Sequence, residues 1–118
     1  MSLANFVSRV FNRAYRCFGS FEELPKHCGT RVFVAADKKT REQFGNALAF
    51  CFGNEIYVKN RRLWTVRIKR HEMVHIRQFK RMGLYFPLAY AWEYCLNGYW
   101  ENVFEKEARR GERIKKKR

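Results

Sequence analysis

The chain has 118 residues, of which 47% are hydrophobic and 17% are aromatic. This length predicts one domain over residues 1–118, and so many apolar side chains exclude a chain that is disordered throughout. Lysine and arginine number 25 against 11 acidic residues, which gives a formal net charge of +14. Such an excess favours acidic partners, such as nucleic acid, although no nucleic-acid-binding motif accompanies the charge.

The sequence carries no clear targeting signal. The N-terminus lacks a basic segment followed by an apolar run and a small-residue cleavage site, so no signal peptide is predicted. No stretch reaches the roughly 18 apolar residues that span a bilayer, so no transmembrane segment is expected. The four cysteines include no C-x-x-C pair, which argues against a cysteine zinc site, and Cys51 and Cys95 lie in apolar stretches, which favours reduced thiols. We therefore expect a cytoplasmic protein.

Residues 3–18 place apolar side chains at helical spacing, and Arg9, Arg13 and Arg16 occupy the other face. This pattern predicts an amphipathic helix. A basic amphipathic helix can lie on a membrane or in the groove of a partner, but we interpret this one as packing its apolar face on the core. Residues 20–29, which contain Pro25 and Gly29, are expected to form a loop.

The following segments combine short apolar runs with helical patterns. A buried strand is expected at 30–36 and a helical turn at 38–45. Apolar runs at 47–52 and 55–59 flank Gly53-Asn54, which predicts a β-hairpin. Helices are predicted at 63–82, from Pro87 to about Leu96, and from about Trp100 into a basic C-terminal tail at 109–118. The expected fold is α+β, with a small, three-stranded, mostly antiparallel sheet.

The longest helical pattern contains His71-Glu72-Met73-Val74-His75, an H-E-x-x-H motif. Residues four apart lie on the same face of a helix, so both imidazoles can reach one Zn²⁺ ion. Glu72 projects beside the metal, where it can act as a general base on zinc-bound water. Two core histidines that merely satisfied each other would be unusual here. The motif therefore predicts a zinc site with His71 and His75 as ligands.

A third protein ligand is expected, because catalytic zinc sites usually keep three such ligands and a water. His27 lies far upstream, and no cysteine has a suitable spacing. An acidic side chain from a downstream helix is the natural choice. The residues alone leave these candidates open: Glu93, Glu101, Glu105, Glu107 and Glu112. Gln78 lies on nearly the same face as the two histidines, and we expect it to be a buried polar support.

The order of these motifs resembles that of the gluzincin metallopeptidases, especially the short single-domain members called minigluzincins. The similarity covers about half the chain: a strand at 56–58, H-E-x-x-H-x-x-Q at 71–78, a bracing helix at 85–96, Gly98-Tyr99, and F-E-x-x-A at 104–108. The resemblance implies a zincin-like domain in which Glu105 is the third zinc ligand, with Glu101 and Glu107 as weaker candidates. Larger gluzincins often place a supporting aspartate where this chain has Arg109.

The resemblance implies a zinc-dependent metallopeptidase that hydrolyses a peptide or protein substrate. A strand at 47–52 or 55–59 would hold the extended substrate at a sheet edge. Tyr90, Tyr94 and Tyr99 are candidates for stabilising the oxyanion, and nothing in the sequence selects among them. Some short gluzincins resemble latent forms, and the basic tail here could cover its own cleft. The alternative is a non-catalytic, zinc-binding adaptor whose basic surface holds nucleic acid or an acidic partner.

Overall fold

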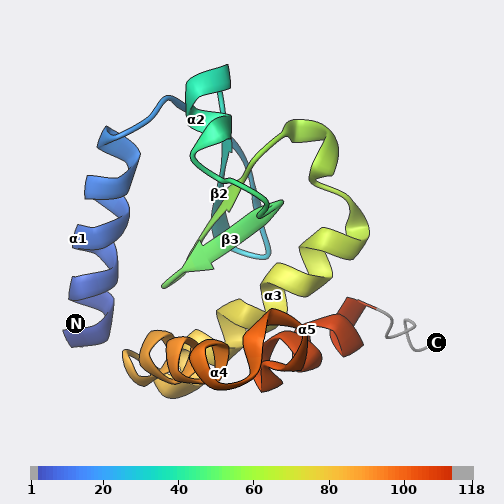
Figure 1. Cartoon of the computed structure of the whole chain (residues 1–118). Helices are drawn as coiled ribbons and strands as arrows, with labels where there is room; N and C mark the ends of the chain where they lie inside the picture. Colours follow the sequence, from blue (N-terminus) through green and yellow to red (C-terminus); the bar gives the residue numbers. More distant parts are fainter. Residues whose placement is uncertain (1–2, 113–118) are drawn as a thin grey trace.

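Residues 3–112 are described by the computed structural model, in which two pairs of strands, separated by a short helix, are followed by a 3-10 helix at Arg61–Leu63 and three α-helices (Figure 1). The helices are α1 (Leu3–Cys17), α2 (Lys38–Glu42), α3 (Val66–Met82), α4 (Tyr85–Glu101) and α5 (Val103–Glu112), and the strands are β1 (Phe21–His27), β2 (Thr30–Ala35), β3 (Ala49–Phe52) and β4 (Glu55–Val58). In Figure 1 the last three helices gather below the sheet. The predicted α+β class is confirmed, whereas the zincin-like arrangement stays a prediction.

The sheet has four strands rather than the three expected, in the order β1-β2-β4-β3. The β2–β4 pair is parallel, and the two outer pairs are antiparallel. The additional strand is β1, which the sequence analysis assigned to a loop because of Pro25 and Gly29. It lies at a sheet edge, where a proline without an N–H is tolerated, and its pairing is irregular between Leu24 and His27. The hairpin around Gly53 is confirmed as β3 and β4.

Alternating side chains of β2 and β4 build one core on each face of the sheet. On one face, buried aliphatic side chains pack together with a residue of α3: Val32, Val34, Ile56, Val58 and Ile76. On the other face, aromatic rings meet beside α1: Tyr15, Phe33, Phe50 and Tyr57. The sheet is therefore a rigid platform between α3, which carries the H-E-x-x-H motif, and α1.

Local signals set the ends of the helices that follow the sheet. α3 begins at Val66, after the predicted start at 63, because the Thr65 side chain caps it by accepting a hydrogen bond from the Ile68 amide. α4 continues past its expected end, and Gly98, at a φ of 75°, kinks it instead. α5 begins at Val103, after the expected start near 100, because the Asn102 side chain accepts from the Phe104 amide at 2.8 Å.

α1 packs on the protein with Phe11 and Tyr15 of its apolar face and with part of its polar side, so the predicted packing on the core holds for only part of the apolar face. Ser8 and Asn12 are buried, at 5% and 2% exposure, whereas Phe6 and Val10 are exposed at 57% and 54%. Asn12 Nδ2 donates a hydrogen bond to the Phe52 carbonyl at 3.0 Å. This bond satisfies a backbone acceptor at the end of β3. The rotation of α1 is thus set by polar contacts with the hairpin together with the ring contacts of Phe11 and Tyr15.

No helix within residues 3–112 is long and apolar enough to cross a membrane. All four cysteine thiols are free, as expected for a reduced protein. The cellular compartment stays a prediction.

Candidate metal centre

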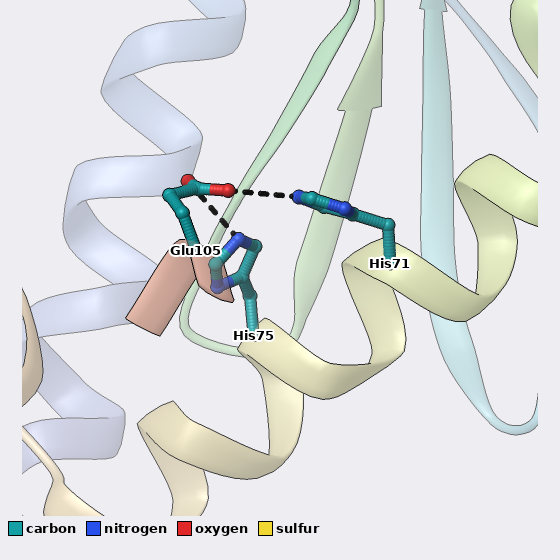
Figure 2. A group of neighbouring side chains, drawn as sticks. All are labelled: His71, His75 and Glu105. Carbon is teal, nitrogen blue, oxygen red and sulfur yellow. Dashed lines mark hydrogen bonds and ion pairs between the residues drawn. The ribbon is translucent and has the colours of Figure 1, made fainter. Parts of the chain in front are cut away.

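The two histidines of the motif project from one side of α3 toward a carboxylate on α5. His71, His75 and Glu105 are all buried. The Nε2 atom of His71 lies 2.9 Å from Glu105 Oε1, and the Nε2 atom of His75 lies 3.2 Å from Glu105 Oε2 (Figure 2). The fold thus brings together the two motif histidines and the acidic residue that the family resemblance selected.

The geometry of this cluster suits a small metal ion. One ligand atom from each of the three side chains lies within 4.8 Å of the others. Ligands about 2.0–2.2 Å from a tetrahedral zinc ion would lie about 3.4 Å apart. The observed nitrogen–oxygen separations of 2.9 and 3.2 Å are slightly shorter, as expected for side chains in direct contact. A small outward movement would make room for an ion.

The second ring nitrogen of His75 is bound by Gln78. His75 Nδ1 lies 2.8 Å from Gln78 Oε1. The orientation of this amide is fixed by its other end, because Gln78 Nε2 donates to the Phe104 carbonyl at 3.1 Å and to Glu107 at 2.7 Å. Since an amide oxygen can only accept, His75 Nδ1 carries the hydrogen. The prediction that Gln78 is a buried polar support is confirmed.

His71 is held in the same way by a carboxylate. Its Nδ1 atom lies 2.5 Å from Glu112 Oε2, and Glu112 also pairs with Arg67. An ionised carboxylate accepts, so Nδ1 of His71 donates. Each histidine therefore directs Nε2 at Glu105 while its Nδ1 is held by a second acceptor. Such outer partners orient histidine ligands and raise their basicity in zinc sites.

Electrostatics at the centre favour an ionised carboxylate surrounded by positive charge. Glu105 accepts hydrogen bonds from both histidines and from the Tyr90 hydroxyl. Burial acts to raise the pKa of Glu105, but these donors outweigh it and hold that pKa well below its usual range. Burial acts to lower the pKa values of His71 and His75, but the bonds to Glu105 outweigh it, and both pKa values are raised.

The hydrogen-bond pattern also tests whether the residues fit a zinc ion. With both Nδ1 atoms donating, a neutral ring would turn the lone pair of Nε2 toward the ionised Glu105, so that an acceptor would face an acceptor. A proton on each Nε2 removes this conflict, and so does a cation between the nitrogens and the carboxylate. Neutral imidazole and carboxylate are zinc ligands, and zinc competes with protons for them. The residues therefore fit this metal.

Glu72 is buried beside the histidines but takes no part in their hydrogen bonds. Its Oε1 atom has no hydrogen-bond partner among the described residues. Burial raises the pKa of Glu72, although the neighbouring His75 and His71 oppose this shift. A carboxylate with a raised pKa and a free acceptor oxygen is suited to take a proton near neutral pH. This is the chemistry that the motif predicts for Glu72.

The centre opens into a cleft of about 1180 Å³ between β3 and the helices α3 and α4. β3 is an edge strand, so its outer backbone groups face no other strand of the sheet. Tyr90, Tyr94 and Tyr99 also line the cleft. Tyr90 is committed to Glu105, and burial together with the Glu105 charge raises the pKa of Tyr99 to about 12. A cleft with an exposed strand edge can accommodate an extended peptide.

Three of the other acidic candidates, Glu93, Glu101 and Glu107, have their partners outside the histidine pair. Glu93 and Glu101 bond to neighbours outside the centre, and Glu107 binds the far side of Gln78. Arg109, at the position where the gluzincin resemblance would place an aspartate, donates to the Trp100 carbonyl and lies over the Trp100 ring at 4.8 Å. It supports neither histidine.

Sequence reasoning missed the role of Glu112, because this residue was assigned to a basic tail. The sequence does contain a signal: Glu112 follows Glu105 by seven residues, which is two helical turns. Both carboxylates therefore project from the same face of α5 toward α3. Glu112, and not a residue at position 109, therefore holds His71 in its orientation.

Comparison with known proteins identifies no relative: no family model, curated protein or solved structure matches this chain. Membership of the gluzincins stays a prediction.

Proposed function

We propose that this protein is a zinc-dependent peptide hydrolase of the gluzincin type. The observation that carries this proposal is the convergence of His71, His75 and Glu105 beside the unpaired carboxylate of Glu72. A purely structural cluster would have no need for a buried carboxylate oxygen without a partner, since such a group costs about 1–3 kcal/mol or more. A hydrolytic site does need one, as the acceptor for a proton.

Each residue of the centre would have a separate role in such a site. His71, His75 and Glu105 would hold the metal, while Glu112 and Gln78 keep the two rings oriented. When bound, zinc supplies Lewis-acid chemistry that acidifies water and polarises a carbonyl group. Because Oε1 of Glu72 is free, it accepts the proton of the attacking water and then delivers it to the nitrogen of the cleaved bond.

The substrate class follows from the walls of the cleft. The free edge of β3 offers backbone donors and acceptors to an extended peptide by β-addition. Among the three tyrosines, Tyr90 positions Glu105, since its hydroxyl donates to that carboxylate. Tyr94 and Tyr99 also line the cleft, so either hydroxyl could donate a hydrogen bond to a developing oxyanion.

A second candidate is the zinc-binding adaptor. The observation that favours it is the set of exposed cations close to the start of α3, where Arg61 and Arg67 have side-chain exposures of 61% and 66%. Such a surface can hold nucleic acid without any catalytic step. This candidate shares the metal site with the peptidase but does not need Glu72.

Substitution of Glu72 separates the two candidates. We expect wild-type protein to bind one zinc ion per chain and His75→Ala to bind none, by metal analysis after dialysis. Glu72→Gln should keep zinc and fold but lose hydrolysis of a denatured peptide mixture by about 10²–10⁴-fold, because it removes the proton acceptor. Glu101→Gln, on an exposed side chain that pairs with Lys106, is the matched control. A Glu72→Gln variant as active as wild type would refute the assigned base.

Inactive wild-type protein would require a test of latency before the adaptor is preferred. The expected covering segment includes residues 113–118, which lie outside the described residues. Truncation should end after Glu112, because this residue holds His71. Hydrolysis that appears on truncation would support a latent peptidase. Loss of nucleic-acid binding without any gain of hydrolysis would support the adaptor.

A further inference from the structure

α1 presents an apolar face that the fold does not use. Leu3, Phe6 and Val10 follow one another at steps of three and four residues, so they share one face of the helix. Their exposures are 70%, 57% and 54%. The apolar spacing of residues 3–18 predicted packing on the core, but only part of the apolar face, with Phe11 and Tyr15, packs there. The side chains of Leu3, Phe6 and Val10 are left available to a partner.

The rotation of α1 is fixed by specific contacts with the hairpin. Asn12 bonds to the Phe52 carbonyl, and Arg16 forms an ion pair with Glu55. Ser8 lies so close to Gly53 that a Cβ atom there would be 2.6 Å from the Ser8 Cβ. These contacts hold Ser8 and Asn12 inward, and they turn Leu3, Phe6 and Val10 away from the sheet.

Charge selects what can cover this face. α1 contains three arginines and no acidic residue, and the chain as a whole has a net charge of +14. Arg9 and Arg13 are exposed and follow the border of the apolar face. A second copy of the chain would bring the same positive charge, so self-association through α1 is opposed by repulsion. An anionic surface is attracted instead.

We propose that α1 lies on an anionic phospholipid bilayer, with Leu3, Phe6 and Val10 inserted among the lipids and Arg9 and Arg13 at the headgroups. A helix with a strongly amphipathic pattern, phenylalanine on one face and arginine on the other suits this position. A bilayer also suits the shape, because a single helix presents a convex ridge and not a groove that would receive a segment of an acidic protein. No residue of α1 lines the cleft of the metal centre.

The location of α1 leaves the metal centre accessible on a bilayer. Figure 1 shows α1 along one side of the molecule and α5 toward the other. The inference does not depend on zinc or on hydrolysis. It makes this chain a peripheral membrane protein whose contact is electrostatic and apolar together, so binding should weaken as salt rises.

Vesicle flotation with the full chain tests the proposal. We expect wild-type protein to float with vesicles that contain phosphatidylglycerol and not with vesicles of phosphatidylcholine alone. A double variant, Phe6→Ser with Val10→Ser, should lower the partition coefficient by at least about tenfold, because it removes two exposed apolar side chains. Arg13→Gln should lower it by about fivefold. Both variants should keep the wild-type thermal midpoint.

Trp92→Ser is the matched control, since Trp92 is also exposed but lies on α4. Retained binding by this control, together with loss in the α1 double variant, would support the proposal. Loss in the control alone would overturn it in favour of α4. A wild-type protein that binds neither kind of vesicle would also overturn it, as would a dimer that the α1 double variant converts to monomer. Binding to polyglutamate but not to vesicles would point to an acidic protein instead.

Discussion

Replacement of Gln78 by leucine tests the part of the metal centre that depends least on the metal. Gln78 is 1% exposed and links His75 of α3 to the Phe104 carbonyl of α5. Leucine has a similar size but neither accepts nor donates. The substitution therefore removes the network and largely keeps the packing.

The cost can be worked out from the groups that lose their partner. His75 Nδ1 stays at the buried interface between α3 and α5, where Gln78 is its hydrogen-bond partner, whereas the Phe104 carbonyl belongs to helix α5 and can also accept a helical backbone bond. An unsatisfied buried polar group costs about 1–3 kcal/mol, so the metal-free protein should lose about 1–2 kcal/mol of stability after the gain from a buried leucine. The ring of His75 also loses its fixed orientation, and zinc affinity should fall by about 10–100-fold.

Two measurements check these values. Urea denaturation of metal-free protein gives the free energy of unfolding, and competition with a chromophoric chelator gives the zinc affinity. Gln43→Leu is the control, because exposed Gln43 also donates to a backbone carbonyl, that of Phe18. It should change stability by no more than about 0.5 kcal/mol. A Gln78→Leu protein with wild-type zinc affinity would refute the assigned role, whatever its stability.

Two further predictions concern pH and the hairpin. His71 and His75 have raised pKa values in the folded protein, so their contribution to metal-free stability is complete below about pH 6.5 and is lost as pH rises through the raised values. Zinc competes with those protons, so zinc affinity should rise as pH rises over the same range. Denaturation at pH 6 and pH 8, with chelator and with zinc, measures both changes. A metal-free protein that gains stability toward pH 8 would contradict the prediction. Gly53→Ala should destabilise the fold by about 1–3 kcal/mol or more, because φ is +63° and the new Cβ would lie 2.6 Å from the Ser8 Cβ; an unchanged thermal midpoint would show that α1 can move away at no cost.

The elements that could be predicted from the sequence are those whose local pattern agrees with their tertiary environment. The spacing of His71 and His75 determines a shared helix face wherever that helix is placed. The Gly53-Asn54 turn likewise predicts a hairpin from the chain alone. Glu105 needed more than spacing, because five acidic residues were available and the family resemblance, not the residues, selected it.

The failures have a common physical cause, since in each case a contact distant in sequence decided the outcome. β1 is a strand in spite of Pro25 because it pairs with β2 at an edge. Part of the apolar face of α1, with Leu3, Phe6 and Val10, is turned outward because Asn12 binds the hairpin. Glu112 joins the centre because α5 lies along α3. The periodicity of apolar residues within one segment does not indicate which surface of the protein that segment will pack against.

The contacts between α3 and α5 also explain why metal binding should be measurable without any activity. His71 is bound by two carboxylates of α5, His75 by one of them, and Gln78 by the Phe104 carbonyl. Polar bonds that join these helices therefore pass through the candidate centre, and they require positive charge next to Glu105. Protons can supply that charge only while the histidines are ionised, whereas a zinc ion supplies it at neutral pH as well. The docking of α5 should thus depend on zinc most strongly at the pH at which the histidines lose their protons. Added zinc should therefore increase the stability of the protein even in a variant that has no catalytic base.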